Sequence, residues 1–306
     1  MPGPSNPLTT ARQGLLLMAL AMAIVPGMDA IAKLLTTSLA PGQIAWSRFA
    51  AQTLVLVPVM LLIRRPLRSG CLRLHAARGG LLGLAILLMV WGLVHLPLAN
   101  AIAIFFIEPL ILTLLAALLL GERIGRRRLL AVLVGLMGAL IVIRPNWQAF
   151  GPASLLPAGT AVCFAGYLLL TRYSAGNDDA MTMQLWAGVF ACIALGVVLL
   201  IPPLTGGGGA GVLALRWPDA TVWGWIALLG AVSALGHVIL AEAFRRADAS
   251  MLAPLQYLEI LSAVAFGWLL FGDFPDLLTW LGTALIVAAG LALFLGDEPL
   301  PGDGSE

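Results

Sequence analysis

Long apolar runs dominate the chain, and short groups of proline, glycine and arginine separate them. A helix needs about 20 mostly apolar residues to cross the hydrocarbon core of a bilayer. The spacing predicts an all-α integral membrane protein with ten transmembrane helices, and because the third and fifth are the shortest, nine or eleven are the alternatives. The ten ranges are Gly14–Ser38, Gln43–Ile63, Gly79–His95, Pro97–Leu120, Leu129–Ile143, Pro152–Arg172, Met181–Ile201, Val222–Ala243, Ala249–Phe271 and Leu277–Leu295.

Composition supports a membrane protein and excludes several other classes. Of the 306 residues, 60% are apolar and 10% charged, whereas a soluble domain carries roughly 25% charged residues. The net charge of +2 and the absence of a basic patch argue against nucleic-acid binding. Three cysteines without a Cys-x-x-Cys pair predict neither a disulfide framework nor a metal site. The first range has an alternative as a signal peptide, but its apolar run is long and nine more follow, which favours a membrane helix.

Arginines are distributed unequally between the two sides of the predicted membrane. With the N-terminus in the cytoplasm, thirteen arginines fall on that side and two on the other, so the positive-inside rule predicts cytoplasmic segments at residues 1–13 and 297–306. The inside set is Arg12, Arg64, Arg65, Arg68, Arg73, Arg78, Arg123, Arg126, Arg127, Arg128, Arg172, Arg245 and Arg246, and the outside set is Arg144 and Arg216.

The fourth and ninth ranges match each other at an offset of 151 residues. Glu108 aligns with Glu259, and Gly121-Glu122 aligns with Gly272-Asp273. A chance match between two Leu/Ala/Gly-rich helices is the alternative. The chain has only 15 acidic residues, however, and two pairs of them, Glu108 with Glu259 and Glu122 with Asp273, share the same offset. We therefore predict two five-helix repeats, 14–145 and 146–296. Five is an odd number, so the repeats are inverted, which is typical of alternating-access transporters.

These segments resemble the EamA-domain group of the drug/metabolite transporter superfamily over essentially the whole chain. The resemblance rests on Pro109 with Gly121-Glu122 and Gly138, on Pro254 with Gln256-Tyr257-Leu258-Glu259, Gly272-Asp273 and Gly290, and on Asp29 to Lys33 with Ser47-Arg48-Phe49. Within the superfamily the chain is most similar to carriers of S-adenosylmethionine, riboflavin or opine-type metallophores. The resemblance implies a ten-helix carrier of the bacterial inner membrane, with a central cavity lined by helices 1, 3, 4, 6, 8 and 9, and without an ATPase domain or a bound cofactor.

Charged residues inside hydrocarbon are costly and usually face a cavity or a partner. Asp29 and Lys33 lie four residues apart on one helix face, so we expect them to pair; the pair is either structural or binds the polar end of a substrate. Arg48 either joins a charge cluster with Asp29 or extends to the outer interface, and we favour the interface.

Glu108 and Glu259 fall near the middle of their predicted helices. Burial in a low-dielectric medium disfavours a charged carboxylate, so such a group can exchange a proton. Either glutamate is thus a candidate for proton coupling or substrate binding, and a helix-packing role is the alternative. We prefer Glu259, because Gln256 and Tyr257 beside it add polar and aromatic contacts.

Three further residues, His237, Trp91 and Tyr167, have a functional and a structural interpretation each, and a fourth, Glu242, has a structural one. His237 is a candidate proton relay or a hydrogen-bonded packing group, and Glu242 is expected to pair with Arg245 or Arg246. Trp91 and Tyr167 either stack on a substrate or pack in the interior, and we favour packing. The glycines Gly79, Gly80, Gly83, Gly135 and Gly138 predict close helix approach within the chain or in a homodimer.

The predicted function is secondary transport of a small zwitterionic metabolite, such as an amino-acid derivative or an opine-type metallophore, with export favoured and with protons as candidate coupling ions. Uptake of S-adenosylmethionine or riboflavin is the alternative. A membrane-embedded enzyme is disfavoured because the His-Glu-x-x-His, Asp-rich and Gly-x-Ser-x-Gly motifs are absent from the sequence. We expect no cofactor and no metal.

Overall fold

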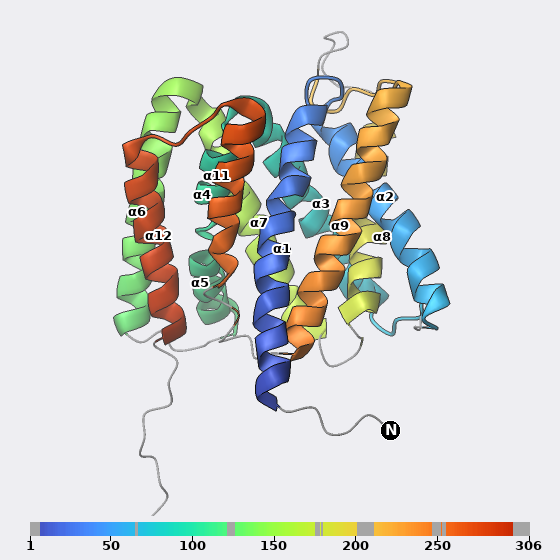
Figure 1. Cartoon of the computed structure of the whole chain (residues 1–306), viewed down its shortest axis with the longest axis horizontal. Coiled ribbons are helices and arrows are strands. Elements are labelled where there is room, and N and C mark those ends of the chain that lie inside the picture. The colour runs from blue at the N-terminus through green and yellow to red at the C-terminus, as the bar shows by residue number, and fades with distance from the viewer. Residues whose placement is uncertain are drawn as a thin grey trace, which may run out of the picture.

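In a computed structural model, the described residues form a bundle of helices without strands (Figure 1). The described residues are 7–64, 67–120, 126–174, 178, 180–200, 211–246, 252 and 255–295. The α-helices are α1 (Pro7–Leu35), α2 (Pro41–Leu62), α3 (Leu72–His95), α4 (Leu98–Phe105), α5 (Glu108–Leu120), α6 (Arg126–Phe150), α7 (Leu156–Ser174), α8 (Ala180–Leu200), α9 (Ala220–Arg246), α11 (Leu258–Phe271) and α12 (Leu277–Leu295), and the 3-10 helix η1 covers Gly151–Leu155.

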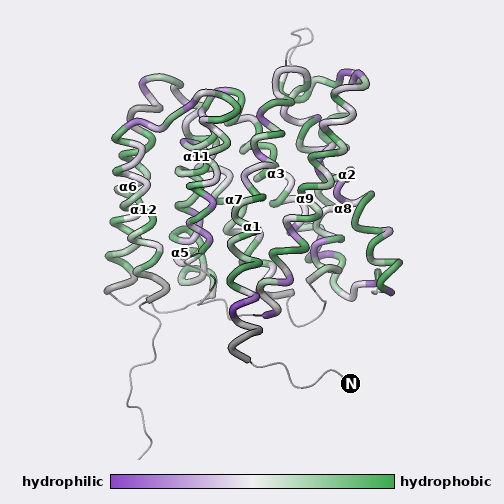
Figure 2. Tube along the Cα trace, in the orientation of Figure 1, coloured by the Kyte–Doolittle hydropathy of each residue, from purple (hydrophilic) through white to green (hydrophobic). Residues whose placement is uncertain are grey.

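Seven helical stretches within the described residues are long and apolar enough to cross a membrane, and three shorter apolar helices accompany them. The shorter ones are Leu129–Ile143, Leu258–Phe271 and Leu277–Ala292. Apolar residues cover much of the tube in Figure 2, and many large ones, such as Leu16, Leu54 and Leu118, are exposed on the outside of the bundle. This surface suits contact with lipid. The all-helical prediction is confirmed, and ten membrane crossings stay a prediction.

Helix contacts in one half of the chain recur in the other. When α1, α2, α3, α5 and α6 are exchanged for α7, α8, α9, α11 and α12, the contact of α1 with α9 becomes that of α7 with α3. Likewise, α2 with α9 becomes α8 with α3, and α1 with α11 becomes α7 with α5. The α2–α8 and α6–α12 pairs map onto themselves. Two related five-helix units produce this pattern.

Glycines bring helices of the two halves into close contact. A Cβ on Gly138 of α6 would lie 2.7 Å from the Gly282 carbonyl oxygen, and one on Gly282 of α12 would lie 2.6 Å from the Gly138 carbonyl oxygen. On α3, a Cβ on Gly79 would lie 2.5 Å from the Phe190 Cβ of α8. These small residues therefore pack within the chain, so they do not by themselves indicate a dimer.

The predicted fourth span is not a continuous helix. Helix α4 ends at Phe105, residues 106–107 form a turn, and α5 begins at Glu108. Pro109 explains the break, because proline has no N–H and its ring clashes with the carbonyl of residue i−4, which is Phe105. The repeated segment is interrupted at the matching place, since Tyr257 forms a turn before α11. The rings of Phe106 and Tyr257 lie 5.4 Å apart, so the two breaks meet inside the bundle.

Candidate functional site

A cavity of about 440 Å³ occupies the middle of the bundle and is called here the central cavity. Helices α1, α3, α4, α5, α7, α9 and α11 line it, which are the helices that the resemblance implies, and Arg48 of α2 also contributes. The residues that line it are Met22, Val25, Met28, Asp29, Arg48, Ile86, Met89, Ile102, Phe105, Phe106, Glu108, Pro109, Leu112, Thr160, Phe164, Leu168, His237, Leu240, Gln256 and Glu259. Six of the ten predicted site residues are among them.

An ion pair between α1 and α2 forms the charged centre of this cavity. Arg48 Nη1 donates to Asp29 Oδ1 at 3.3 Å, and the two side chains are 7% and 11% exposed. Two expectations are therefore wrong. Asp29 pairs with Arg48 and not with Lys33, and Arg48 is buried instead of reaching the interface. Arg48 Nε has no hydrogen-bond partner among the described residues, so one guanidinium donor stays available.

Glu259 and His237 belong to the same electrostatic group. The charges of Asp29 and Arg48 act on Glu259, and the charge of Arg48 acts on His237. His237 Nδ1 lies 2.7 Å from the Ser233 carbonyl oxygen. A carbonyl only accepts, so Nδ1 carries the proton and, in the neutral ring, Nε2 is an acceptor. Glu259 lines the central cavity, which makes its carboxyl group available to a ligand there.

Glu108 occupies a different environment from Glu259 despite the 151-residue offset. It begins α5, is 9% exposed, and its Oε1 has no hydrogen-bond partner among the described residues. Its charge acts on Tyr257, but no such coupling connects it to Arg48. The structure therefore provides one carboxyl group beside an ion pair and a second one that is isolated in an apolar wall.

Gln256 lines the central cavity, whereas its neighbour Tyr257 is directed elsewhere. A Cβ on Gly290 of α12 would lie only 1.4 Å from the Tyr257 hydroxyl oxygen, so the hydroxyl fills the space that this glycine leaves open. That hydroxyl has no hydrogen-bond partner within the described part of the chain. Tyr257 packs between Phe106 and α12, and its polar end does not face the cavity.

Lys33 lies on the far side of Asp29, outside the central cavity. Its Nζ donates to Asp273 Oδ2 at 2.9 Å and to the Leu96 carbonyl oxygen at 3.1 Å, and it lies 4.6 Å from the centre of the Phe271 ring. The partner Asp273 was noticed in the sequence only as a repeat position. Glu122, its counterpart in the first repeat, lies outside the described residues.

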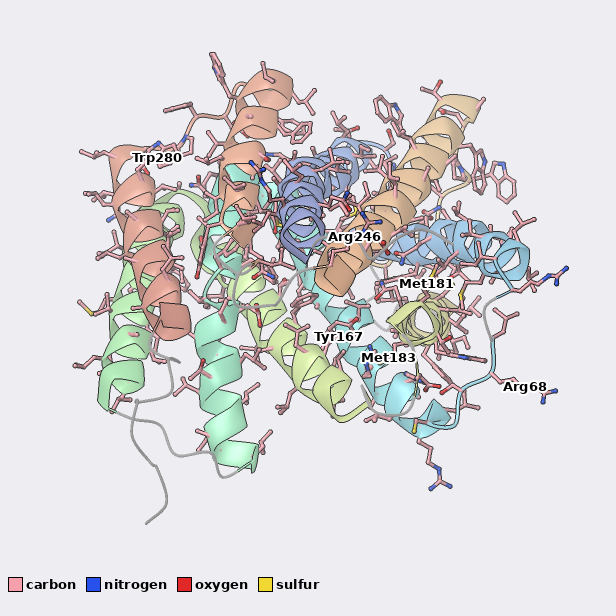
Figure 3. The ribbon with its side chains drawn as sticks, turned by 60° about the horizontal axis from the view of Figure 1, so that its bottom comes forward. Arg68, Tyr167, Met181, Met183, Arg246 and Trp280 are labelled. Carbon is pink, nitrogen blue, oxygen red and sulfur yellow. The ribbon has the colours of Figure 1, made fainter. Side chains whose placement is uncertain are left out.

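Trp91 and Tyr167 are also outside the central cavity. Trp91 lines a second pocket of about 320 Å³, the end pocket, at the end of the bundle where α1 stops and α2 starts. Tyr167 belongs to α7 and lies nearer the opposite end of the bundle, where Figure 3 shows it near Met183. Its hydroxyl donates to Gln184 Oε1 at 3.3 Å, and Arg78 lies 5.2 Å from its ring centre. The packing interpretation of Tyr167 is thus the one that its contacts support.

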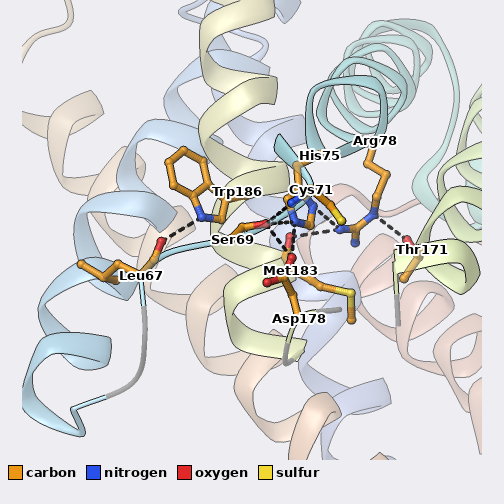
Figure 4. A network of polar contacts seen from close by, with 9 residues as sticks. All are labelled: Leu67, Ser69, Cys71, His75, Arg78, Thr171, Asp178, Met183 and Trp186. Atoms are coloured by element: carbon orange, nitrogen blue, oxygen red, sulfur yellow. Dashed lines mark hydrogen bonds and ion pairs between the residues drawn. The ribbon is translucent and has the colours of Figure 1, made fainter. Parts of the chain in front are cut away.

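A polar network at the end of the bundle that carries the start of α1 was not predicted (Figure 4). His75 Nε2 lies 2.9 Å from both Ser69 Oγ and Asp178 Oδ2, and Arg78 Nη1 lies 2.8 Å from His75 Nδ1. Because a guanidinium only donates, Nδ1 accepts and the ring proton is on Nε2. The hydrogen bond from Ser69 and then the contact with His75 hold the pKa of Asp178 below its ordinary value of 3.8.

At the same end, Glu242 pairs with Arg246 as predicted.

Comparison with known proteins identifies the architecture. The profile of the EamA-like transporter family matches residues 12–144 and again residues 152–295. A protein of known crystal structure, 21% identical in sequence, superimposes with a TM-score of 0.58 over 94% of this chain and 96% of its own. At this identity, the structural match shows a shared fold only.

Three relatives carry names with different substrates. A riboflavin transporter of Vibrio cholerae is 32% identical over 80% of this chain and 79% of its own length. A pseudopaline exporter of Pseudomonas aeruginosa is 29% identical over 92% and 96%, respectively. An S-adenosylmethionine uptake transporter of Rickettsia bellii is 26% identical over 88% and 89%.

Proposed function

This chain belongs to the EamA-like transporter family, and from that premise we propose that it is a proton-coupled secondary carrier of a small zwitterionic metabolite, acting as an exporter in the bacterial inner membrane. Its relatives are named as a transporter, an exporter and an uptake transporter, so membrane transport is common to all of them. Alternating access by two inverted repeats, 14–145 and 146–296, supplies the movement.

The observation that carries the proposal is the mixture of charges in the central cavity. Arg48 has an unpartnered donor and suits a carboxylate. Glu259 lines the same cavity, and its carboxylate suits an ammonium group. Both lie in one electrostatic group with Asp29. A ligand with both charges can bind to this group without leaving either buried charge unpaired, whereas a singly charged ligand cannot.

Proton exchange follows from competition for Glu259. The ammonium group of the substrate pairs with the ionised carboxylate, and protonation removes the charge that attracts it. The proton and the substrate therefore bind to this residue in turn and not together. A proton that enters from the outside displaces the substrate there, and its release to the cytoplasm frees the carboxylate for the next substrate molecule, so proton entry drives export.

The distribution of arginines between the two ends of the bundle supports an orientation in the membrane. Exposed or partly exposed arginines collect at the end where α1 begins, where Figure 3 shows Arg68 directed away from the bundle and Arg246 on α9. Arg216 lies at the opposite end, before α9. We therefore assign the first end to the cytoplasm and the end with the end pocket to the outside.

A second candidate is uptake of riboflavin or S-adenosylmethionine. The observation in its favour is a group of phenylalanines, Phe105, Phe106 and Phe164, that line the central cavity and offer flat faces to a ring system. Riboflavin carries no ammonium group, so it would make little use of the carboxyl groups, and its transport should not depend on Glu259. S-Adenosylmethionine carries an ammonium group and a carboxylate, so the direction of its flux relative to the pH gradient, and not Glu259, separates its uptake from export.

Reconstituted transport distinguishes them. Purified protein in proteoliposomes is supplied with labelled amino-acid derivatives, S-adenosylmethionine and riboflavin, with and without an imposed pH gradient. We expect gradient-dependent flux of a zwitterion that is lost in Glu259→Gln and kept in Glu242→Gln, a matched change in the half-buried Glu242–Arg246 pair outside the central cavity. Flux that ignores both the gradient and Glu259→Gln refutes proton coupling through this residue.

A further inference from the structure

The only lysine of the chain lies between the two cavities. Along α1, Asp29 lines the central cavity, Lys33 follows one helical turn later, and Thr36 lines the end pocket. The Lys33 side chain is 15% exposed, so it is mostly enclosed at this boundary.

The segment that joins α3 to α4 also extends from the central cavity to the end pocket. Met89 of α3 lines the central cavity, and Trp91 and His95 line the end pocket. The next residue, Leu96, presents its carbonyl oxygen to Lys33 Nζ. Two separate chain segments therefore pass from one cavity to the other at the level of this ammonium group.

The end of α11 supplies the third segment. Gly272 adopts φ 73°, a left-handed conformation that glycine tolerates, and ends the helix. The Gly272 N–H donates to the Trp268 carbonyl at 3.0 Å and the Asp273 N–H donates to the Gly267 carbonyl at 3.1 Å. This cap fixes the backbone of Asp273, whose carboxylate then accepts from Lys33.

We propose that Lys33, Asp273 and the Leu96 carbonyl form the gate that closes the central cavity toward the end pocket; this rests on the alternating access proposed above. Lys33 belongs to the first repeat and Asp273 to the second, so their contact holds the two halves together at this end. Opening a path between the cavities separates the three segments and breaks the contact.

The chemistry of the contact suits a closure that opens repeatedly. A buried apolar seal exposes hydrocarbon to water when it parts, whereas Lys33 and Asp273 gain hydration when they separate, which offsets the lost ion pair. Asp273 is 33% exposed even in the closed arrangement. Thr36 and Thr37 line the end pocket, and their hydroxyl oxygens, which donate to the Lys33 and Leu34 carbonyls, can still accept a hydrogen bond from the released ammonium group.

Cysteine accessibility tests this gate without knowledge of the substrate. In a chain whose three native cysteines are replaced by alanine, Met89→Cys places a reporter in the central cavity. A membrane-impermeant methanethiosulfonate is added from the side of the end pocket, and the labelling rate is measured. Lys33→Gln and Asp273→Asn are compared with the parent, and Glu242→Gln serves as a control that removes an ion pair at the opposite end.

We expect each single variant to raise the labelling rate roughly three- to tenfold, the shift that goes with loss of one partly exposed ion pair from a two-state equilibrium. The charge exchange Lys33→Asp with Asp273→Lys should return the rate toward that of the parent, and the control should not change it. Unchanged labelling in both single variants of folded protein overturns the gate, as does an equal rise in the control. Transport by wild-type proteoliposomes is scored separately, so failure of the gate and failure of the carrier proposal are distinguishable.

Discussion

Gly290→Ala should displace Tyr257 and destabilise the bundle where the two helix breaks meet. The new methyl group would lie 1.4 Å from the Tyr257 hydroxyl oxygen. Ordinary contact needs about 3.4 Å, so the ring must retreat by about 2 Å, toward Phe106. Overpacking of this kind costs about 1–3 kcal/mol, and alanine's higher helix propensity returns no more than about 1 kcal/mol.

Tyr257→Phe provides the internal control for this prediction. The tyrosine hydroxyl is buried without a described partner, so its removal should leave stability unchanged or raise it by about 1 kcal/mol. Without the hydroxyl, the nearest ring atom lies 2.7 Å from the new methyl group, and the required shift falls to about 0.7 Å. Gly290→Ala should therefore cost less in the Phe background, with a coupling energy of about 1 kcal/mol.

Thermal unfolding in detergent measures the midpoints of the four proteins, which are the wild type, Gly290→Ala, Tyr257→Phe and the double variant. We expect Gly290→Ala to lower the midpoint by several degrees and the double variant to recover much of the loss. Equal midpoints for Gly290→Ala and wild type refute the contact. A double variant no more stable than Gly290→Ala shows that the hydroxyl is not the obstacle.

Three other predictions concern helix contact, pH and charge. Gly79→Ala should lower the unfolding midpoint, because its Cβ meets α8, whereas Gly80→Ala, with nothing within 4 Å, should maintain or raise it. Asp178→Asn should destabilise the protein near neutral pH. Because the pKa of Asp178 is lower in the folded state, the stability that the carboxylate contributes is present above pH 3.8 and is lost as the pH falls through the folded pKa. The unfolding midpoints of the variant and the wild type should therefore converge only in stronger acid. Arg48→Gln alone should leave Asp29 as an unpaired buried charge and cost about 3–5 kcal/mol, while Arg48→Gln with Asp29→Asn should cost less, which the same unfolding assay checks.

Much of the architecture was predictable because it depends on local composition. Apolar runs of membrane-spanning length predict helices at nearly the observed places, although α3 begins at Leu72 instead of Gly79 and α6 extends to Phe150 instead of Ile143. The 151-residue offset identifies matching segments, and both are interrupted before their glutamates. The break at Pro109 had a sequence signal, since proline removes a helix hydrogen bond, but the apolar run concealed it.

Partners of the charged groups were not predictable in the same way. The i, i+4 rule favours Asp29 with Lys33, yet each finds a partner on another segment, 19 and 240 residues away. The buried network of His75 with Asp178 spans 103 residues and left no motif. Local spacing states which groups can meet on one helix, but a buried charge takes whichever opposite charge the packing brings nearest.

The sequence alone therefore determines that the protein lies in a lipid bilayer, that it is helical, which family it resembles and which charged residues are available to a carrier. The reason is that the length of apolar runs and the spacing of the repeats are properties of the chain itself. The tertiary structure decides that Arg48 and Glu259 share the central cavity, that Tyr257 is directed toward α12, and that Lys33 is separated from Asp29. The physical reason is that these outcomes depend on which helices the glycine contacts and the two helix breaks bring together, and that choice is made by packing across the whole bundle.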